Sequence, residues 1–202
     1  GAFVIVQTLF AFVSALGYAL AFQPFTKFAA ETEDYGPYAV ASVLLCGVFH
    51  LLVSGTLLLF RQFLIPIFDP TGNANIILLL KYVPLLLVTS LYRSYAISLL
   101  QTTYQVQKIF WIDAAYFIGT IILIVIARQL NRFNTAEDIV VVNLVGISFS
   151  TLLSVFLTFN SLKRRLIFQR DAFFKMVNFG KFSFGGNAVY TVELSGSGLR
   201  VR

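Results

Sequence analysis

Long apolar runs, separated by short polar segments, dominate the pattern of this chain. A helix that crosses a bilayer needs about 20 mostly apolar residues. Stretches of that kind lie at 2–23, 38–60, 76–100, 109–127 and 139–159. Pro24 discourages the first helix from continuing, and the run 69–73 is a strong turn signal. The pattern therefore predicts an all-α polytopic transmembrane bundle with about five complete spans.

After the fifth stretch the pattern changes to a basic segment rich in aromatic residues. Residues 163–181 contain no apolar run of spanning length and predict an amphipathic linker on the cytoplasmic face. Residues 182–192 look like the start of another span, and the Ser-Gly-Ser-Gly run at 195–198 looks like a linker. We therefore expect a helix bundle in 1–162, a cytoplasmic basic linker in 163–181, and a truncated helix start with a non-helical tail in 182–202.

Composition agrees with a chain whose solvent is the bilayer. Hydrophobic residues make up 58% and charged residues 12% of its 202 positions, and the mean hydropathy is +0.83. A soluble domain of this size could not bury so much apolar surface. The sequence therefore predicts an integral membrane protein.

The net charge of +6 is unevenly distributed. Five spans place alternate connections on opposite sides of the membrane. One side carries Lys27, Lys108, Lys163, Arg164, Arg165, Arg170, Lys175 and Lys181, and the other carries Arg61, Arg128 and Arg132. The positive-inside rule places the larger group in the cytoplasm, so the chain starts outside, and we expect an earlier span before it. The basic run directly follows a span, where anionic lipid headgroups account for it, so no nucleic-acid partner is predicted.

No pattern in the sequence favours a metal, a cofactor or an enzyme. Cys46 is the single cysteine and His50 the single histidine, which excludes internal disulfides, thiolate clusters and histidine-rich metal sites. A phosphate-binding G-x-x-x-x-G-K-[ST] loop is absent, because Lys175 stands where Gly180-Lys181 would need an earlier glycine. The acidic residues cluster only in loops. We therefore predict no cofactor and no catalytic activity.

Two stripes of small and polar residues follow helical spacing. They are formed by Ser42, Cys46, His50 and Ser54 in the second stretch and by Asn143, Gly146, Ser150, Ser154 and Thr158 in the fifth. Such stripes let helices approach closely and form hydrogen bonds in lipid, which favours packing over a hydrated cavity. His50 is accordingly expected to be a packed residue, with a role in ion coupling as the alternative.

Charged residues inside the spans are the most informative chemistry. Lys81 lies about 9 Å into the third span for a helix that starts at Asn75, at 1.5 Å per residue, and can reach the outer surface with its long side chain. Arg93 lies deeper, where a cation costs about 2.5–3.5 kcal/mol on insertion scales. It either lines a cavity that attracts an anion such as phosphate, or it pairs with Asp113 at the start of the next stretch. The sequence leaves both possibilities open.

The candidate site residues follow from these positions. The candidates for a substrate cavity are Arg93, Lys81, Arg61, Ser90 and Gln101. The candidates for an ion pair or for ion coupling are Asp113 and His50.

Three segments are similar to a known family of membrane proteins. Gly1-Ala2-Phe3 with the run from Gly17 to Phe28 resembles the second helix of the polysaccharide flippases, the Wzx-like members of the multidrug/oligosaccharidyl-lipid/polysaccharide exporter superfamily. The stretch from Arg93 to Asp113 resembles their connection between helices four and five. Asp171 to Gly186, with Phe179-Gly180-Lys181-Phe182, resembles the linker that leads into helix seven.

The resemblance implies a fold and a function. The five spans would correspond to helices two to six of one six-helix lobe, so helix one and the second lobe would lie outside this chain. Family members carry a lipid-linked oligosaccharide from the cytoplasmic to the outer leaflet by alternating access. The implied substrate is a polyprenyl-diphosphate glycan, and the implied partners are membrane lipid, a glycan polymerase and glycosyltransferases. The implied location is the bacterial inner membrane.

Three other functions compete with this expectation. An exporter of small cationic molecules in the same superfamily would favour intramembrane carboxylates, and Asp113 is the one acid near a span. A membrane assembly subunit without transport would hold Arg93 permanently paired with Asp113. A membrane glycosyltransferase or polymerase needs a substantial loop with catalytic acids, and the loops here are short.

Overall fold

The structure of this chain is a bundle of long helices. A computed structural model describes residues 2–60, 62–63, 79–131, 135–159 and 167–197, with side chains except at residue 2 and in 187–197. Its elements are α1 (Ala2–Gly17), the π-helical segment η1 (Tyr18–Phe22), α2 (Gln23–Ala30), α3 (Gly36–Leu59), α6 (Tyr82–Thr102), α7 (Val106–Gln129), α8 (Ala136–Thr158) and α9 (Arg170–Ser197). The described residues contain no strand, so the predicted all-α fold is confirmed.

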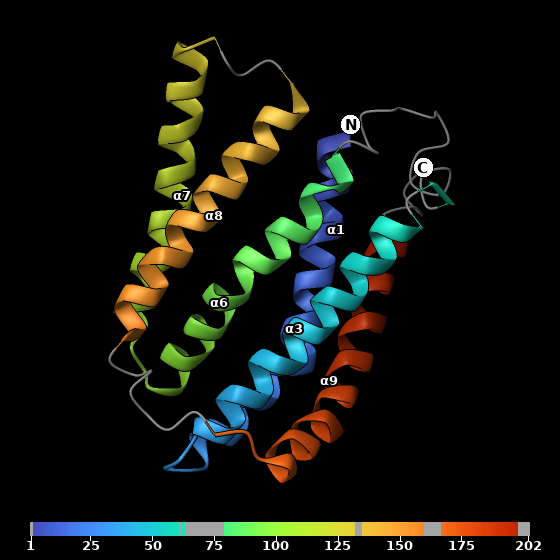
Figure 1. The fold of residues 1–202 in the computed structure, drawn as a ribbon, viewed down its shortest axis with the longest axis vertical. Coiled ribbons are helices and arrows are strands. Elements are labelled where there is room, and N and C mark those ends of the chain that lie inside the picture. The colour runs from blue at the N-terminus through green and yellow to red at the C-terminus, as the bar shows by residue number, and fades with distance from the viewer. Residues whose placement is uncertain (1, 61, 64–78, 132–134, 160–166, 198–202) are drawn as a thin grey trace.

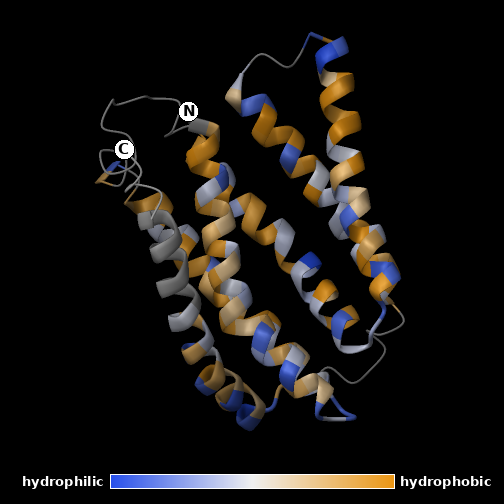
Figure 2. Ribbon diagram, turned by 180° about the vertical axis from the view of Figure 1, so that it is seen from behind, coloured by the Kyte–Doolittle hydropathy of each residue, from blue (hydrophilic) through white to orange (hydrophobic). Residues whose placement is uncertain are grey.

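Five helices in the described part of the chain are long and apolar enough to cross a bilayer. They are Phe3–Ala30, Gly36–Leu59, Tyr82–Thr102, Val106–Gln129 and Ala136–Thr158. Figure 2 shows apolar residues along the helices, with many of the hydrophilic residues near their ends. The chain is therefore a multi-pass membrane protein, as the hydrophobic pattern predicts.

Helix α6 lies at the centre of the bundle. In Figure 1 it runs between the pair α7 and α8 on one side and the group α1, α3 and α9 on the other. Two buried clusters hold these parts together. One contains Val6, Val13, Leu86 and Val140, and the other contains Phe22, Phe25, Cys46, Tyr95 and Met176.

The first span continues past Pro24, where the sequence predicted its end. Inside an α-helix, a proline has no N–H for the carbonyl four residues back, and its ring collides with that carbonyl. This carbonyl belongs to Leu20, which lies in η1. There the backbone opens into a wider turn, with the Gln23 N–H bonded to Tyr18 O. The π turn thus accommodates Pro24 in the first turn of α2 and lets the span continue to Ala30.

Helix α9 corrects the expected organisation of the C-terminal segments. It runs without a break from Arg170 to Ser197, across the expected boundary at 181–182 and into the expected non-helical tail. It lies along α3 and η1 instead of flat on one end of the bundle (Figure 1). Residues 160–166 and 198–202 lie outside the described residues, so the rest of the predicted linker and tail stays a prediction.

Small or apolar residues on the inward face of α9 explain why this helix packs along the bundle. Ala172, Met176 and Gly180 are buried at spacings of four, on one side of the helix. At Gly180 the helix comes very close to η1, because a Cβ built there would lie 2.1 Å from Leu20 O. Only glycine permits this approach. In the structure, the amphipathic helix α9 therefore packs along the bundle. The sequence had predicted that this segment lies on a membrane surface.

The helices alternate in direction, and their charges differ between the two ends of the bundle. The end where α3, α7 and α9 begin (Figure 1) carries Lys27, Lys108, Arg170 and Lys175, and Lys181 lies about three turns further along α9. We call it the basic end. The opposite end carries Lys81 and Arg128 among the described residues. This arrangement agrees with the orientation that the positive-inside rule predicts.

Candidate functional site

An ion pair joins two helices within their spanning segments. Arg93 of α6 donates through Nη2 to Asp113 Oδ1 of α7. The Arg93 side chain is 22% exposed and that of Asp113 is 43% exposed. An unpaired charge inside a bilayer is costly, so a neighbouring opposite charge stabilises both groups. Of the two possibilities that the sequence left open for Arg93, the structure contains the pair with Asp113.

Arg93 also contacts the third helix of this region. Its Nε donates to Ser150 Oγ of α8 at 3.0 Å, and the Ser150 hydroxyl donates to Ile112 O of α7 at 2.7 Å. The guanidinium carbon lies 5.5 Å from the ring centroid of Tyr116, within the range of a cation–π contact. One arginine thus links α6, α7 and α8.

Amide side chains extend these contacts to the first helix. Tyr116 OH donates to Asn143 Oδ1 at 2.6 Å, and Asn143 Nδ2 donates to Gln7 Oε1 at 2.8 Å. Polar groups inside a membrane must find partners within the protein, because lipid offers none. We call these connected residues the polar network: Gln7, Arg93, Asp113, Tyr116, Asn143 and Ser150.

Lys81 belongs to a different site, at the end of the bundle opposite the basic end. Its Nζ lies 3.2 Å from Glu137 Oε1, and Tyr82 OH donates to the same oxygen. The hydrogen bond to Glu137 raises the pKa of Lys81. Lys81 and Arg93 are 12 residues apart along one helix, or about 18 Å at 1.5 Å per residue. The structure therefore does not bring these two candidates together, and each has its own carboxylate partner.

The remaining cavity candidates do not join the polar network in the described residues. The Ser90 hydroxyl donates to Leu87 O of its own helix. Gln101 accepts a hydrogen bond from Tyr18 OH at 3.0 Å, near the basic end. Arg61 lies outside the described residues, so its role stays a prediction.

His50 packs against the first helix at the start of η1. Its Nε2 lies 3.6 Å from Cys46 Sγ, and a Cβ on Gly17 would lie 2.7 Å from the same nitrogen. The ring is buried, and no described group forms a hydrogen bond with its Nδ1. The described hydrogen bonds do not connect His50 to Arg93 or Asp113. Its position fits the expected packing role.

Sequence reasoning missed two members of the polar network. Gln7 stands alone as an amide in an apolar stretch, and Tyr116 lies one helical turn after Asp113. Asn143 and Ser150 were part of a predicted polar stripe, but their partners were not predicted. In the part of the chain that the structure describes, no three His, Cys, Asp or Glu side chains gather to hold a metal ion.

Comparisons with protein-family models, curated proteins and solved structures find no significant match for this chain.

Proposed function

We propose that this chain is part of a transporter that moves a lipid-linked oligosaccharide across the bacterial inner membrane by alternating access. The observation that carries this proposal is a partly exposed ion pair inside the membrane, Arg93 with Asp113. Ionisable residues within transmembrane segments commonly mark the path of a substrate or an ion. The resemblance to polysaccharide flippases supports the same conclusion.

The chemistry of the pair suits a diphosphate substrate. A guanidinium binds phosphate oxygens through two parallel hydrogen bonds, which a carboxylate can also accept. In the empty protein, Asp113 neutralises Arg93. When the substrate enters, its diphosphate takes the place of the carboxylate, while the polyprenyl chain stays in the lipid. Between transport events, Asp113 thus lowers the free-energy cost of the Arg93 charge within the membrane.

The position of Asp113 connects this exchange to a movement of helices. Helix α7 lies at the edge of the bundle, and Ile112 is the one buried residue among the described residues of this helix. Its contact with α6 includes the bond between Arg93 and Asp113. Releasing Asp113 would loosen α7 from α6 while Ser150 still holds Arg93 to α8. Such a local change could accompany a shift between inward and outward states.

A membrane assembly subunit without transport is the second candidate. The observation that favours it is the completeness of the polar network, in which Arg93 already has a counter-charge and a hydroxyl partner. In that case the network would only specify how the helices pack.

The experiment that separates these functions compares two variants in the native cells. Arg93→Ala is expected to abolish glycan export. The double variant Arg93→Gln with Asp113→Asn removes both charges and keeps groups that can form hydrogen bonds. We expect it to reach wild-type membrane levels without exporting glycan, as measured by surface glycan and by accumulated lipid-linked precursor. Normal export by either variant would contradict the transport proposal.

A further inference from the structure

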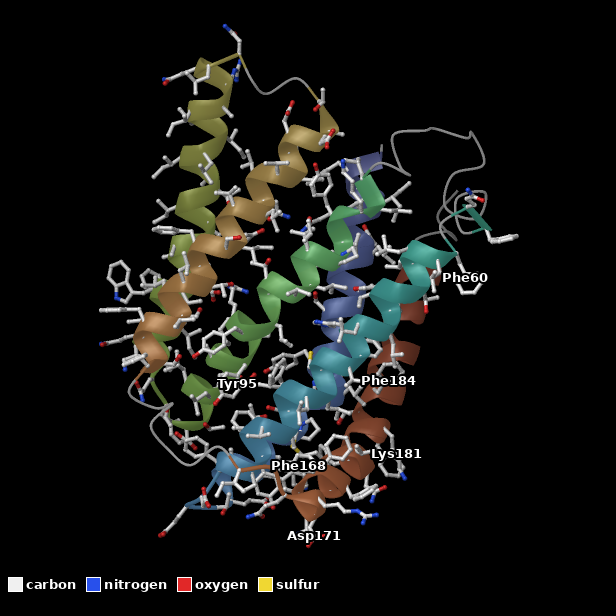
Figure 3. All side chains as sticks on the ribbon, in the orientation of Figure 1. Phe60, Tyr95, Phe168, Asp171, Lys181 and Phe184 are labelled. Carbon is white, nitrogen blue, oxygen red and sulfur yellow. The ribbon has the colours of Figure 1, made fainter. Side chains whose placement is uncertain are left out.

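The outward face of α9 near the basic end carries an unusual combination of side chains. Its inward face is filled by small or apolar residues, Ala172, Met176 and Gly180. The exposed residues on the opposite side are Arg170, Asp171, Phe174, Lys175, Asn178, Lys181 and Phe182. Figure 3 shows Asp171 and Lys181 on the lower part of this helix. Cations and large aromatic rings therefore share one exposed surface.

Lys27 of α2 adds a further cation beside this surface. Its Nζ lies 4.5 Å from the ring centroid of Phe179 in α9 and 5.8 Å from that of Phe28. The two rings are themselves in contact, with centroids 5.8 Å apart. Lys175 lies one turn before Phe179 on the same helix, so it is close to this region of α9. We call Lys27, Lys175, Lys181 and their neighbouring rings the α2–α9 surface.

Among the residues that the structure describes, the lysines of the α2–α9 surface form no ion pair with a carboxylate. The ion pairs between described residues are Lys81 with Glu137 and Arg93 with Asp113. Glu31 and Asp171 lie one turn from Lys27 and Lys175 but form no ion pair with them. At the opposite end, Glu137 neutralises Lys81. On the α2–α9 surface, Lys27, Lys175 and Lys181 thus lack an ion-pair partner among the described residues.

The exposed rings restrict what this surface can bind. Phe174 is 50% exposed and Phe182 is 74% exposed. A free phosphate would neutralise the lysine amines but would leave the rings of Phe174 and Phe182 without an apolar partner. A phospholipid supplies an anionic headgroup for the amines and acyl chains for the rings.

We propose that the α2–α9 surface binds an anionic phospholipid of the leaflet at the basic end. Lys27 and Lys175 donate hydrogen bonds to the phosphate oxygens, and Lys181 adds positive charge nearby. Phe174 and Phe182 lie among the acyl chains. Because α9 also contacts η1 through Gly180, the lipid stabilises the docked position of α9. This proposal does not depend on the transport function or on Arg93.

The test measures lipid binding to the purified 202-residue chain by native mass spectrometry. The probes are phosphatidylglycerol, phosphatidylcholine with the same acyl chains, and inorganic phosphate. Lys27→Gln and Lys175→Gln are each expected to weaken phosphatidylglycerol binding about fivefold, which corresponds to about 1 kcal/mol per cation near a membrane surface. Phosphatidylcholine binding should not change.

One control variant makes the result specific. Arg128→Gln removes an exposed cation at the opposite end. It is expected to keep the wild-type preference for phosphatidylglycerol. Three outcomes would overturn the proposal: unchanged phosphatidylglycerol binding in the double variant of Lys27 and Lys175, an equal loss in Arg128→Gln, or inorganic phosphate that binds as tightly as the lipid.

Discussion

Asp113→Ala is expected to destabilise the bundle by about 3 kcal/mol, because Arg93 then keeps its charge inside the membrane without a counter-charge. In the structure, Asp113 is the acid that pairs with Arg93, and Ser150 supplies only a neutral hydroxyl. Reversible unfolding in bicelles, followed by far-ultraviolet circular dichroism, measures the change. The same measurement on Ser150→Ala should show a loss of only about 1 kcal/mol.

A double-mutant cycle isolates the pair itself. Arg93→Leu combined with Asp113→Leu removes both charges, and replacing such a pair by apolar residues is often close to neutral. The double variant should therefore be clearly more stable than either Arg93→Leu or Asp113→Leu alone. If the effects of the two positions simply add, Arg93 and Asp113 do not depend on each other, and the pair described here is absent from the folded protein.

Gly180→Ala is expected to displace α9 from η1 and to destabilise the chain by about 1–3 kcal/mol, the usual cost of overpacking. The new Cβ would meet Leu20 O at 2.1 Å, and it would also lie 3.1 Å from the Leu20 carbonyl carbon. These are backbone atoms, which cannot rotate away as the tip of a side chain can. Pro24 follows Leu20 by four residues, and the backbone at Leu20 is therefore already constrained to the π turn η1.

Gly185→Ala is the matched control for this prediction. Gly185 lies in the same helix, and a Cβ built there would meet no atom within 4 Å. Its substitution should be neutral or slightly stabilising, since alanine favours helix more than glycine does. Thermal unfolding of both variants and cysteine cross-linking between α9 and α3 report the outcome. Equal stabilities for the two variants would show that α9 does not pack on η1 as described.

The five spans could be predicted from the sequence because spanning length depends only on consecutive apolar residues. The pair of Arg93 with Asp113 was one of two open possibilities, since an intramembrane cation requires some partner and this acid was nearest. The pairings of Gln7 and Tyr116 could not be predicted. They depend on which helices become neighbours, and that follows from packing over the whole bundle.

The course of α9 shows a different limit of sequence reasoning. Its basic and aromatic residues have the amphipathic pattern of a helix on a membrane surface, and the same pattern suits a helix packed along a bundle. Which of the two positions α9 takes depends on Gly180. The close approach of Gly180 to the Leu20 backbone is a tertiary contact, which the local sequence does not indicate. The continuation of the first span past Pro24 likewise depends on the π turn, which the local sequence did not indicate.

In the proposed transporter, a diphosphate replaces Asp113 as the partner of Arg93. Binding of a prenyl-diphosphate oligosaccharide to the purified chain, with a neutral prenyl-linked oligosaccharide as the reference, tests this exchange. Wild type should prefer the diphosphate by about tenfold or more, the contribution of one charge-assisted contact. The variant Arg93→Gln with Asp113→Asn should lose this preference while it remains folded. An equal preference in both proteins would contradict the account, because the diphosphate would then bind without Arg93.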